Sequence, residues 1–170
     1  MMFTQPSASL RRVSILAIDK VFASTLMQAK DFFHLASLRY SKQLGLGLQP
    51  MFEIHLVSPD GQPVDSFSNV QLPVDSGLND ADIIILPAFW DDFDNLMQRY
   101  PQVLPWLREQ HARGAVLCAE ASGVFWLAES GLLDGKEATT YWRFFANFAE
   151  RFPKIRLNQD KHLTDADHIY

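Results

Sequence analysis

The sequence predicts an α/β protein, built as a three-layer α/β/α sandwich around a mostly parallel sheet. Two kinds of segment alternate along the chain. One is a short apolar run with the length of a buried strand, and the other has apolar residues that recur at helical spacing. The strand-like runs are uninterrupted, which is typical of parallel strands covered on both faces. Because strands and helices follow one another in turn, right-handed crossovers are expected to place helices on both faces of one sheet.

Three strands and one long helix are expected in the first half of the chain. Residues 13–18 form a short apolar run with the length of a buried strand. Residues 19–45 carry apolar side chains three or four positions apart, which predicts a helix that stops at Gly45. The other predictions for this half are strands at residues 52–58 and 81–86 and, between them, a hairpin or irregular crossing at residues 64–74.

The second half is expected to contain shorter elements. Residues 91–113 are predicted to be helical, with breaks near Pro101 and Pro105, because proline lacks the N–H that a helix interior requires. Gly131 and Pro153 are expected to end two short helices. The elements predicted after the broken helix are a strand at residues 115–120, helices at residues 122–130 and 142–152, and short strands at residues 155–157 and 162–164.

Length and composition favour one acidic globular domain. The chain has 170 residues, a hydrophobic fraction of 48% and a formal net charge of -5. We expect residues 1–11 to be a disordered tail and residues 12–170 to form a single domain. The negative charge argues against binding of DNA or of an anionic membrane by this domain alone. The apolar runs are too short to cross a bilayer and no signal peptide is recognised, so a cytoplasmic protein is expected.

Cofactor and metal chemistry has little support in the sequence. Neither of the glycine-rich patterns that cradle phosphates is present. The five histidines lack a second histidine or a cysteine at ligand spacing, and His162 and His168 belong to a polar segment. Cys118 is the only cysteine, so it cannot form an internal disulfide. We therefore predict no cofactor and no metal.

The segment Glu120-Ala121-Ser122-Gly123 joins a predicted strand directly to a predicted helix. A sharp turn of this kind, a nucleophile elbow, places one side chain at the carboxyl edge of a sheet beside free backbone N–H groups. The glycine permits a close approach of helix and strand. Spacing alone also fits an ordinary junction between a strand and a helix, so both interpretations stand at this point.

Residues 121–142 resemble a known family. Leu127-Ala128, Gly131-Leu-Leu-Asp-Gly135, Ala138-Thr-Thr140 and Trp142 follow one another at a characteristic spacing. This pattern is similar to that of the N-terminal domain of AraC/XylS-type transcriptional regulators. That domain belongs to the PfpI-type branch of the class I glutamine amidotransferase-like superfamily. With weaker agreement on both sides, the resemblance spans most of residues 12–170 and implies a flavodoxin-like fold.

The chain departs from this family at the positions that carry catalysis. Ala121 stands where the family has its elbow cysteine, and Tyr141 stands where it has a histidine. Ala88 and Phe89 replace a glycine pair that shapes the backbone donors of the site. Alanine cannot attack a carbonyl, and a phenol is a poor general base at neutral pH. Cys118 is interpreted as a small buried hydrophobic residue. The resemblance therefore implies a domain that has lost its enzymatic activity.

The ligand-pocket candidates come from the predicted carboxyl edge of the sheet and from the resembling segment. Alternative interpretations place Trp142 in the core, make Trp90 a cap of the following helix and give Glu120 a structural role in the elbow. No residue is assigned a catalytic role. The ligand-binding candidates are Asp19, Phe89, Trp90, Glu120, Ala121, Ser122, Tyr141 and Trp142.

The resemblance implies an effector-sensing or dimerisation domain of a DNA-binding transcriptional regulator. Its expected partners are an unknown small-molecule effector, derived from an amino acid or amine as a family-level expectation, and a second copy in a homodimer. DNA is expected to bind only through a helix-turn-helix domain, which this chain lacks. Since the family continues beyond the position of Tyr170, a C-terminally truncated domain is expected. The alternatives are an active PfpI-type hydrolase, amidase or glyoxalase-like enzyme, and a structural module with a vestigial pocket.

Overall fold

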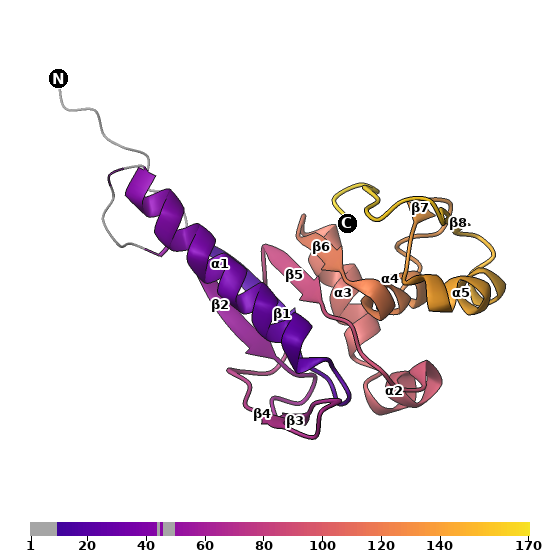
Figure 1. The fold of residues 1–170 in the computed structure, drawn as a ribbon, viewed down its shortest axis with the longest axis horizontal. Helices are drawn as coiled ribbons and strands as arrows, with labels where there is room; N and C mark the ends of the chain where they lie inside the picture. The colour runs from indigo at the N-terminus through magenta and orange to yellow at the C-terminus, as the bar shows by residue number, and fades with distance from the viewer. Residues whose placement is uncertain (1–9, 44, 46–49) are drawn as a thin grey trace.

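The computed structural model describes residues 10–43, 45 and 50–170 (Figure 1). Its central feature is a four-stranded sheet with the order β2-β1-β5-β6, in which all neighbours are parallel. The strands are β1 (Arg11–Leu16), β2 (Phe52–Val57), β5 (Ile83–Leu86) and β6 (Val116–Ala119). The predicted parallel sheet is confirmed. Arg11, which was expected in the tail, begins β1, and residues 1–9 lie outside the described residues.

Helices cover both faces of the sheet. β2 lies beside β1 on one side and β6 lies beside β5 on the other, so the two crossovers run in opposite directions. Right-handed crossovers that run in opposite directions place their helices on opposite faces. The first crossover contains α1 (Ala23–Gln43), and the second contains α2 (Phe93–Arg99) and α3 (Val103–Ala112). The chain therefore forms the expected three-layer α/β/α sandwich.

The burial of β1 explains why its sequence is an uninterrupted apolar run. Consecutive residues of a strand point to opposite faces of its sheet. Val13, Ser14 and Ile15 are nevertheless all inaccessible to solvent, as are Ile84 of β5 and Leu117 of β6. Both faces of the central strands are therefore buried, and the apolar core extends through two layers.

The two long helical predictions are correct in kind and differ in detail. α1 begins at Ala23 and not at residue 19, because the intervening residues form a turn in which Lys20 has a φ of +62°. The helical region of residues 91–113 breaks around Pro101, as predicted. The predicted break at Pro105 is wrong. Pro105 is the third residue of α3, where the backbone N–H has no helical acceptor and its loss costs little.

Shorter elements complete the fold. The predicted hairpin is confirmed, and the two predicted short helices are each preceded by a 3-10 turn that shortens them. The elements are β3 (Val64–Asp65), β4 (Gln71–Leu72), η1 (Ala121–Gly123), α4 (Val124–Glu129), β7 (Glu137–Ala138), η2 (Trp142–Phe144), α5 (Phe145–Arg151) and β8 (Arg156–Leu157). β8 lies within residues 155–157, where a strand is predicted, and pairs in parallel with β7.

The predicted strand at residues 162–164 is wrong. Leu163 in that segment is 69% exposed, so it is not buried in the core as a strand residue would be. Residues 168–170 pair with the open edge of β6 instead, through backbone hydrogen bonds of 2.8 to 2.9 Å. Ile169 is buried to 3% exposure, so it supplies the apolar anchor that the earlier segment lacks.

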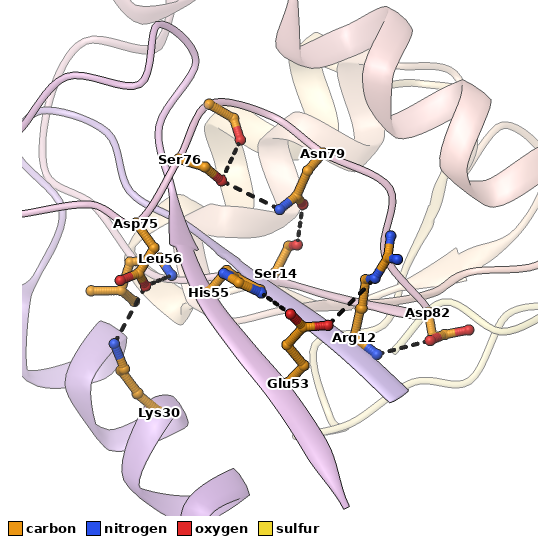
Figure 2. Close-up of polar contacts among 11 residues, drawn as sticks. Arg12, Ser14, Lys30, Glu53, His55, Leu56, Asp75, Ser76, Asn79 and Asp82 are labelled. Carbon is orange, nitrogen blue, oxygen red and sulfur yellow. Dashed lines mark hydrogen bonds and ion pairs between the residues drawn. The ribbon is translucent and has the colours of Figure 1, made fainter. Parts of the chain in front are cut away.

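A polar network near the β2 edge ties α1 to the loop that precedes β5 (Figure 2). The Asp75 carboxylate accepts a hydrogen bond from the Leu56 N–H at 2.8 Å and forms an ion pair with Lys30 at 3.5 Å. The Asp75 N–H in turn donates to the Leu56 carbonyl at 2.7 Å. Asp75 therefore pairs with both backbone polar groups of a buried strand residue that has no strand on its outer side.

We expect Asp75→Ala to lower the free energy of unfolding by about 1–2 kcal/mol, because the Leu56 N–H loses its acceptor in a buried position. Lys30→Met is the matched control, since it removes the ion pair alone and is expected to cost less than about 1 kcal/mol. Urea denaturation followed by tryptophan fluorescence measures both. Equal losses in the two variants would show that the hydrogen bond to Leu56 is not the main contribution.

Candidate functional site

The turn from β6 into α4 has the geometry of a nucleophile elbow. Ala121, the first residue of η1, has a φ of +48°. This left-handed backbone conformation is rare for residues other than glycine and costs about 1–2 kcal/mol. The structure therefore places a strained backbone at the position where the sequence predicts the elbow residue.

Gly123 allows the elbow to lie against the end of the neighbouring strand. A Cβ atom at this position would lie 2.1 Å from the carbonyl oxygen of Leu86, the last residue of β5. The Glu120 N–H donates to that same carbonyl at 3.0 Å. No side chain fits between these backbone segments, so the glycine fixes how closely the start of α4 approaches β5.

The Ser122 side chain locks the loop that follows β5. Its hydroxyl donates to the Phe89 carbonyl at 2.7 Å and accepts from the Phe89 N–H at 2.8 Å. Ser122 is 3% exposed, so both bonds are shielded from water. In the family that the sequence resembles, a glycine at the position of Phe89 helps to shape the backbone N–H donors of the site. In this chain the Phe89 N–H is already bonded to Ser122.

Two hollows each include a residue of the elbow. The first, which we call the aromatic hollow, has a volume of about 380 Å³ and contains Ser122 in its wall. The second, which we call the Ala121 hollow, has a volume of about 330 Å³ and contains Ala121 and Tyr141. The aromatic hollow is lined by Phe89, Trp90, Asp91, Asp92, Phe93, Ser122, Phe125, Phe144 and Asn147. The Ala121 hollow is lined by Ala119, Ala121, Thr139, Thr140, Tyr141, Trp142, Phe145, Gln159, Lys161 and His162.

The structure brings six of the eight candidate residues to these hollows. Phe89, Trp90 and Ser122 line the aromatic hollow, while Ala121, Tyr141 and Trp142 line the Ala121 hollow. Two alternative interpretations fail. Trp142 is 65% exposed and so is not a core residue. The cap of α2 is the Asp92 carboxylate, which accepts from the Asn95 N–H at 3.1 Å, and not Trp90.

Asp19 lines neither hollow. Its carboxylate accepts hydrogen bonds from the Asp65 N–H and from the Tyr100 hydroxyl, each at 2.9 Å, and forms an ion pair with Arg99 at 2.6 Å. Burial, together with the neighbouring Asp19 carboxylate, raises the pKa of Tyr100 to about 12. Asp19 therefore joins the end of β1 to the hairpin and to α2, which is a structural role that the sequence did not reveal.

Glu120 also lines neither hollow. Partial burial raises the pKa of its carboxyl group. Burial, with a smaller contribution from the charge of Glu120, also raises the pKa of the Cys118 thiol. A raised pKa keeps Cys118 protonated at neutral pH and makes it a weak nucleophile.

Sequence reasoning missed several residues at the elbow. The Thr140 hydroxyl donates to the Ala121 carbonyl at 2.9 Å and so holds the elbow from the segment that follows β7. Asp91 and Asp92 directly follow the candidate Trp90, so their place in the chain was the signal that could have identified them. Phe125, Phe144, Asn147, Lys161 and His162 reach the hollows through tertiary packing alone, which no local pattern encodes.

Over the part of the chain that the structure describes, no three His, Cys, Asp or Glu side chains are grouped so that they could hold a metal ion. No helix among the described residues is long and apolar enough to span a membrane.

The sequence profile of the DJ-1/PfpI family matches residues 44–164. The chain belongs to the DJ-1/PfpI family. This assignment confirms the resemblance that the segment around Gly131 indicates. The crystal structure of Drosophila melanogaster DJ-1beta superposes on this DJ-1/PfpI domain with a TM-score of 0.67 at 17% identity, covering 94% of this chain and 80% of that one. At this identity the likeness establishes the fold alone, which is the flavodoxin-like α/β fold that the sequence predicts.

Regulators are prominent among the relatives of this DJ-1/PfpI domain. The HTH-type transcriptional regulator CdhR of Pseudomonas aeruginosa is 30% identical over 122 residues, which are 70% of this chain and 35% of the regulator. The HTH-type transcriptional regulator GbdR of the same species is 23% identical over 146 residues, which are 86% of this chain and 38% of the regulator. The chain thus spans little more than a third of the length of these two relatives.

One solved regulator and one enzyme complete the comparison. An AraC family transcriptional regulator from Pseudomonas putida superposes with a TM-score of 0.72 at 20% identity, covering 92% of this chain and 80% of that one. The isonitrile hydratase of Pseudomonas putida is 33% identical over 98 residues, which are 56% of this chain and 42% of the enzyme. The relatives of this chain therefore include both transcriptional regulators and an enzyme.

We expect Glu120→Gln to raise the free energy of unfolding at about pH 7. Because the folded state raises the pKa of Glu120, ionisation of this group opposes folding, and its stabilising neutral form is lost as the pH rises through the folded-state pKa. The gain should vanish at about pH 3.5, where the wild-type carboxyl is protonated in both states. Chemical denaturation at the two pH values measures the difference, with the exposed Glu150→Gln as control. A gain that is the same at both values would contradict this cause.

Proposed function

We propose that this DJ-1/PfpI domain senses a small-molecule effector for a DNA-binding transcriptional regulator and has no cysteine-based catalysis. The observation that carries the proposal is Ala121, which keeps the strained elbow backbone at a φ of +48° without a nucleophilic side chain. The similarity to HTH-type transcriptional regulators supports the regulatory role. In such a regulator two copies act together, because paired half-sites in DNA call for a two-fold dimer.

Three features of the elbow argue against catalysis. Ala121 has no group that can attack a carbonyl. Cys118 has a raised pKa, so it offers little thiolate at neutral pH. The Phe89 N–H is held by the Ser122 hydroxyl at 2.8 Å and is not free to stabilise an oxyanion. The elbow therefore has no nucleophilic side chain of its own, Cys118 is a weak substitute, and one candidate backbone donor is already bonded.

The shape and charge of the two hollows favour an effector that carries both charges. The aromatic hollow has apolar ring walls together with the carboxylates of Asp91 and Asp92, which attract a cationic group. The Ala121 hollow contains the ammonium group of Lys161, which also pairs with Glu137, and the imidazole of His162, and both groups can donate hydrogen bonds to an anionic group. A ligand that spans the elbow and presents an ammonium group to the first hollow and a carboxylate to the second satisfies both. We therefore propose an amino-acid-derived zwitterion as the effector.

The position of the aromatic hollow links the effector to several elements. Its walls include Phe93 at the start of α2, Phe125 of α4 and Phe144 of η2. A ligand that contacts all three elements changes their relative stability when it binds. Such differential contacts are the requirement for shifting a regulator between two states.

The effector proposal is tested by a thermal-shift screen of amino-acid-derived zwitterions against this chain. At about 100 times its Kd, a ligand is expected to add about 2.7 kcal/mol of stability and to raise the Tm by about 5 °C or more. Ala121→Phe fills one hollow and Asn147→Trp obstructs the other, so each is expected to abolish the shift. Gln102→Trp, at an exposed position before α3, is the matched control and should keep it. A shift that survives both elbow variants would place the ligand elsewhere.

The similarity to isonitrile hydratase supports a second candidate, an active DJ-1/PfpI-type enzyme. Against it, we expect no turnover of ester, amide, methylglyoxal or isonitrile substrates by the wild-type chain, because the elbow lacks a nucleophile. The assay includes Cys118→Ala as control. Turnover that disappears in this variant would identify Cys118 as a nucleophile and would favour the enzyme over the sensor.

A further inference from the structure

Arg143 places a positive charge over a ring that belongs to the wall of the aromatic hollow. Its guanidinium carbon lies 5.6 Å from the centroid of the Trp90 ring. Trp90 is 42% exposed and lines the aromatic hollow. A guanidinium at this distance from an indole ring makes a cation–π contact. The chain therefore places a cation of its own on a ring of the proposed effector site.

The contact with Trp90 is weak enough for a ligand to replace it. Among the residues that the structure describes, no ion pair or hydrogen bond holds the exposed Arg143 side chain. Asp91 and Asp92 directly follow Trp90 and line the same hollow, yet neither of them pairs with Arg143. An exposed cation–π contact changes an equilibrium constant by a factor of only about 2 to 5. The guanidinium can therefore leave Trp90 at a small cost in free energy.

The short segment η2 carries Arg143 between residues of the two hollows. Trp142, the residue before it, lines the Ala121 hollow, and Phe144, the residue after it, lines the aromatic hollow. Tyr141 of the Ala121 hollow also contacts Phe144, with the two ring centroids 6.1 Å apart. The Arg143 guanidinium therefore belongs to a segment that contributes to the walls of both hollows.

Arg143 affects an amine and a zwitterion in opposite ways. The ammonium group of a simple amine must take the place of the guanidinium on Trp90, and the two like charges then repel each other at short range. A zwitterion brings a carboxylate as well, which gives the displaced guanidinium a partner of opposite charge. Guanidinium and carboxylate groups form short charge-assisted hydrogen bonds, often two in parallel. These bonds replace the contact that Arg143 loses at Trp90.

We infer that Arg143 is a specificity-determining residue of the effector site, which favours zwitterions over amines that lack a carboxylate. In the free chain the guanidinium lies on Trp90. When a zwitterion binds, its ammonium group takes that place and Arg143 turns to the carboxylate. Lys161 is less available to the carboxylate, because it already pairs with Glu137. The inference rests on the effector site proposed above, but its test compares variants with defined probes, so the two proposals can fail separately.

The role of Arg143 is tested with butylammonium and 5-aminopentanoate, two probes that differ only by a carboxylate. Titration of the indole N–H signals in NMR spectra of the 170-residue chain gives the Kd of each probe, and Trp90→Phe assigns the Trp90 signal. We expect Arg143→Ala to tighten butylammonium binding by about 2- to 5-fold, because the guanidinium no longer competes for Trp90. We expect the same variant to weaken 5-aminopentanoate binding by about 5-fold, because the carboxylate loses its partner.

Arg39→Ala is the matched control for the loss of one positive charge. Arg39 is an exposed residue of α1, which lines neither hollow, so this variant should leave both Kd values unchanged. Circular dichroism establishes that each variant is folded. A change in the same direction for both probes, or no change for either, would overturn the selective role of Arg143 and leave the effector site standing. Binding of neither probe to wild type or variant would also overturn that role, whereas the effector site is decided by the thermal-shift screen.

Discussion

The elbow of this protein depends on one close approach between two pieces of backbone. Gly123 lies so near the Leu86 carbonyl that a side chain there would come within 2.1 Å of it. Because α4 is held at the end of β5 by this contact, the residue at position 121 is forced into a left-handed conformation at the carboxyl edge of the sheet. Ser122 is then buried against the loop after β5, where its hydroxyl meets both polar groups of Phe89. The two hollows owe their positions to these constraints.

The strands and the elbow could be predicted because their determinants are local. Buried parallel strands require uninterrupted apolar runs, and a glycine after a strand signals a close approach. Errors arose where tertiary context decides the outcome. Pro105 is tolerated because α3 starts two residues before it. Residues 168–170 pair with β6 because Ile169 is buried there, whereas Leu163 of the predicted strand is exposed.

The site was predictable only in part, for the same reason. Phe89, Trp90 and Ala121 follow strand ends, so topology alone brings them to one edge of the sheet. Asp19 also follows a strand end, yet Arg99 and Tyr100 turn its carboxylate into a structural anchor. Asn147 and Lys161 come from segments with no strand-end signal, and only the folded chain brings them to the hollows.

The left-handed backbone at Ala121 shows that shape and reactivity are separable properties of this fold. In an enzyme, strain at an elbow can be attributed to the demands of the reaction on the nucleophile. Here a left-handed backbone occurs at a residue whose side chain is a methyl group, so this conformation does not require a reactive side chain. A protein lineage can therefore exchange the chemistry at this position without rebuilding the scaffold around it. The same fold can thus descend to catalysts and to receptors by substitutions at a few positions.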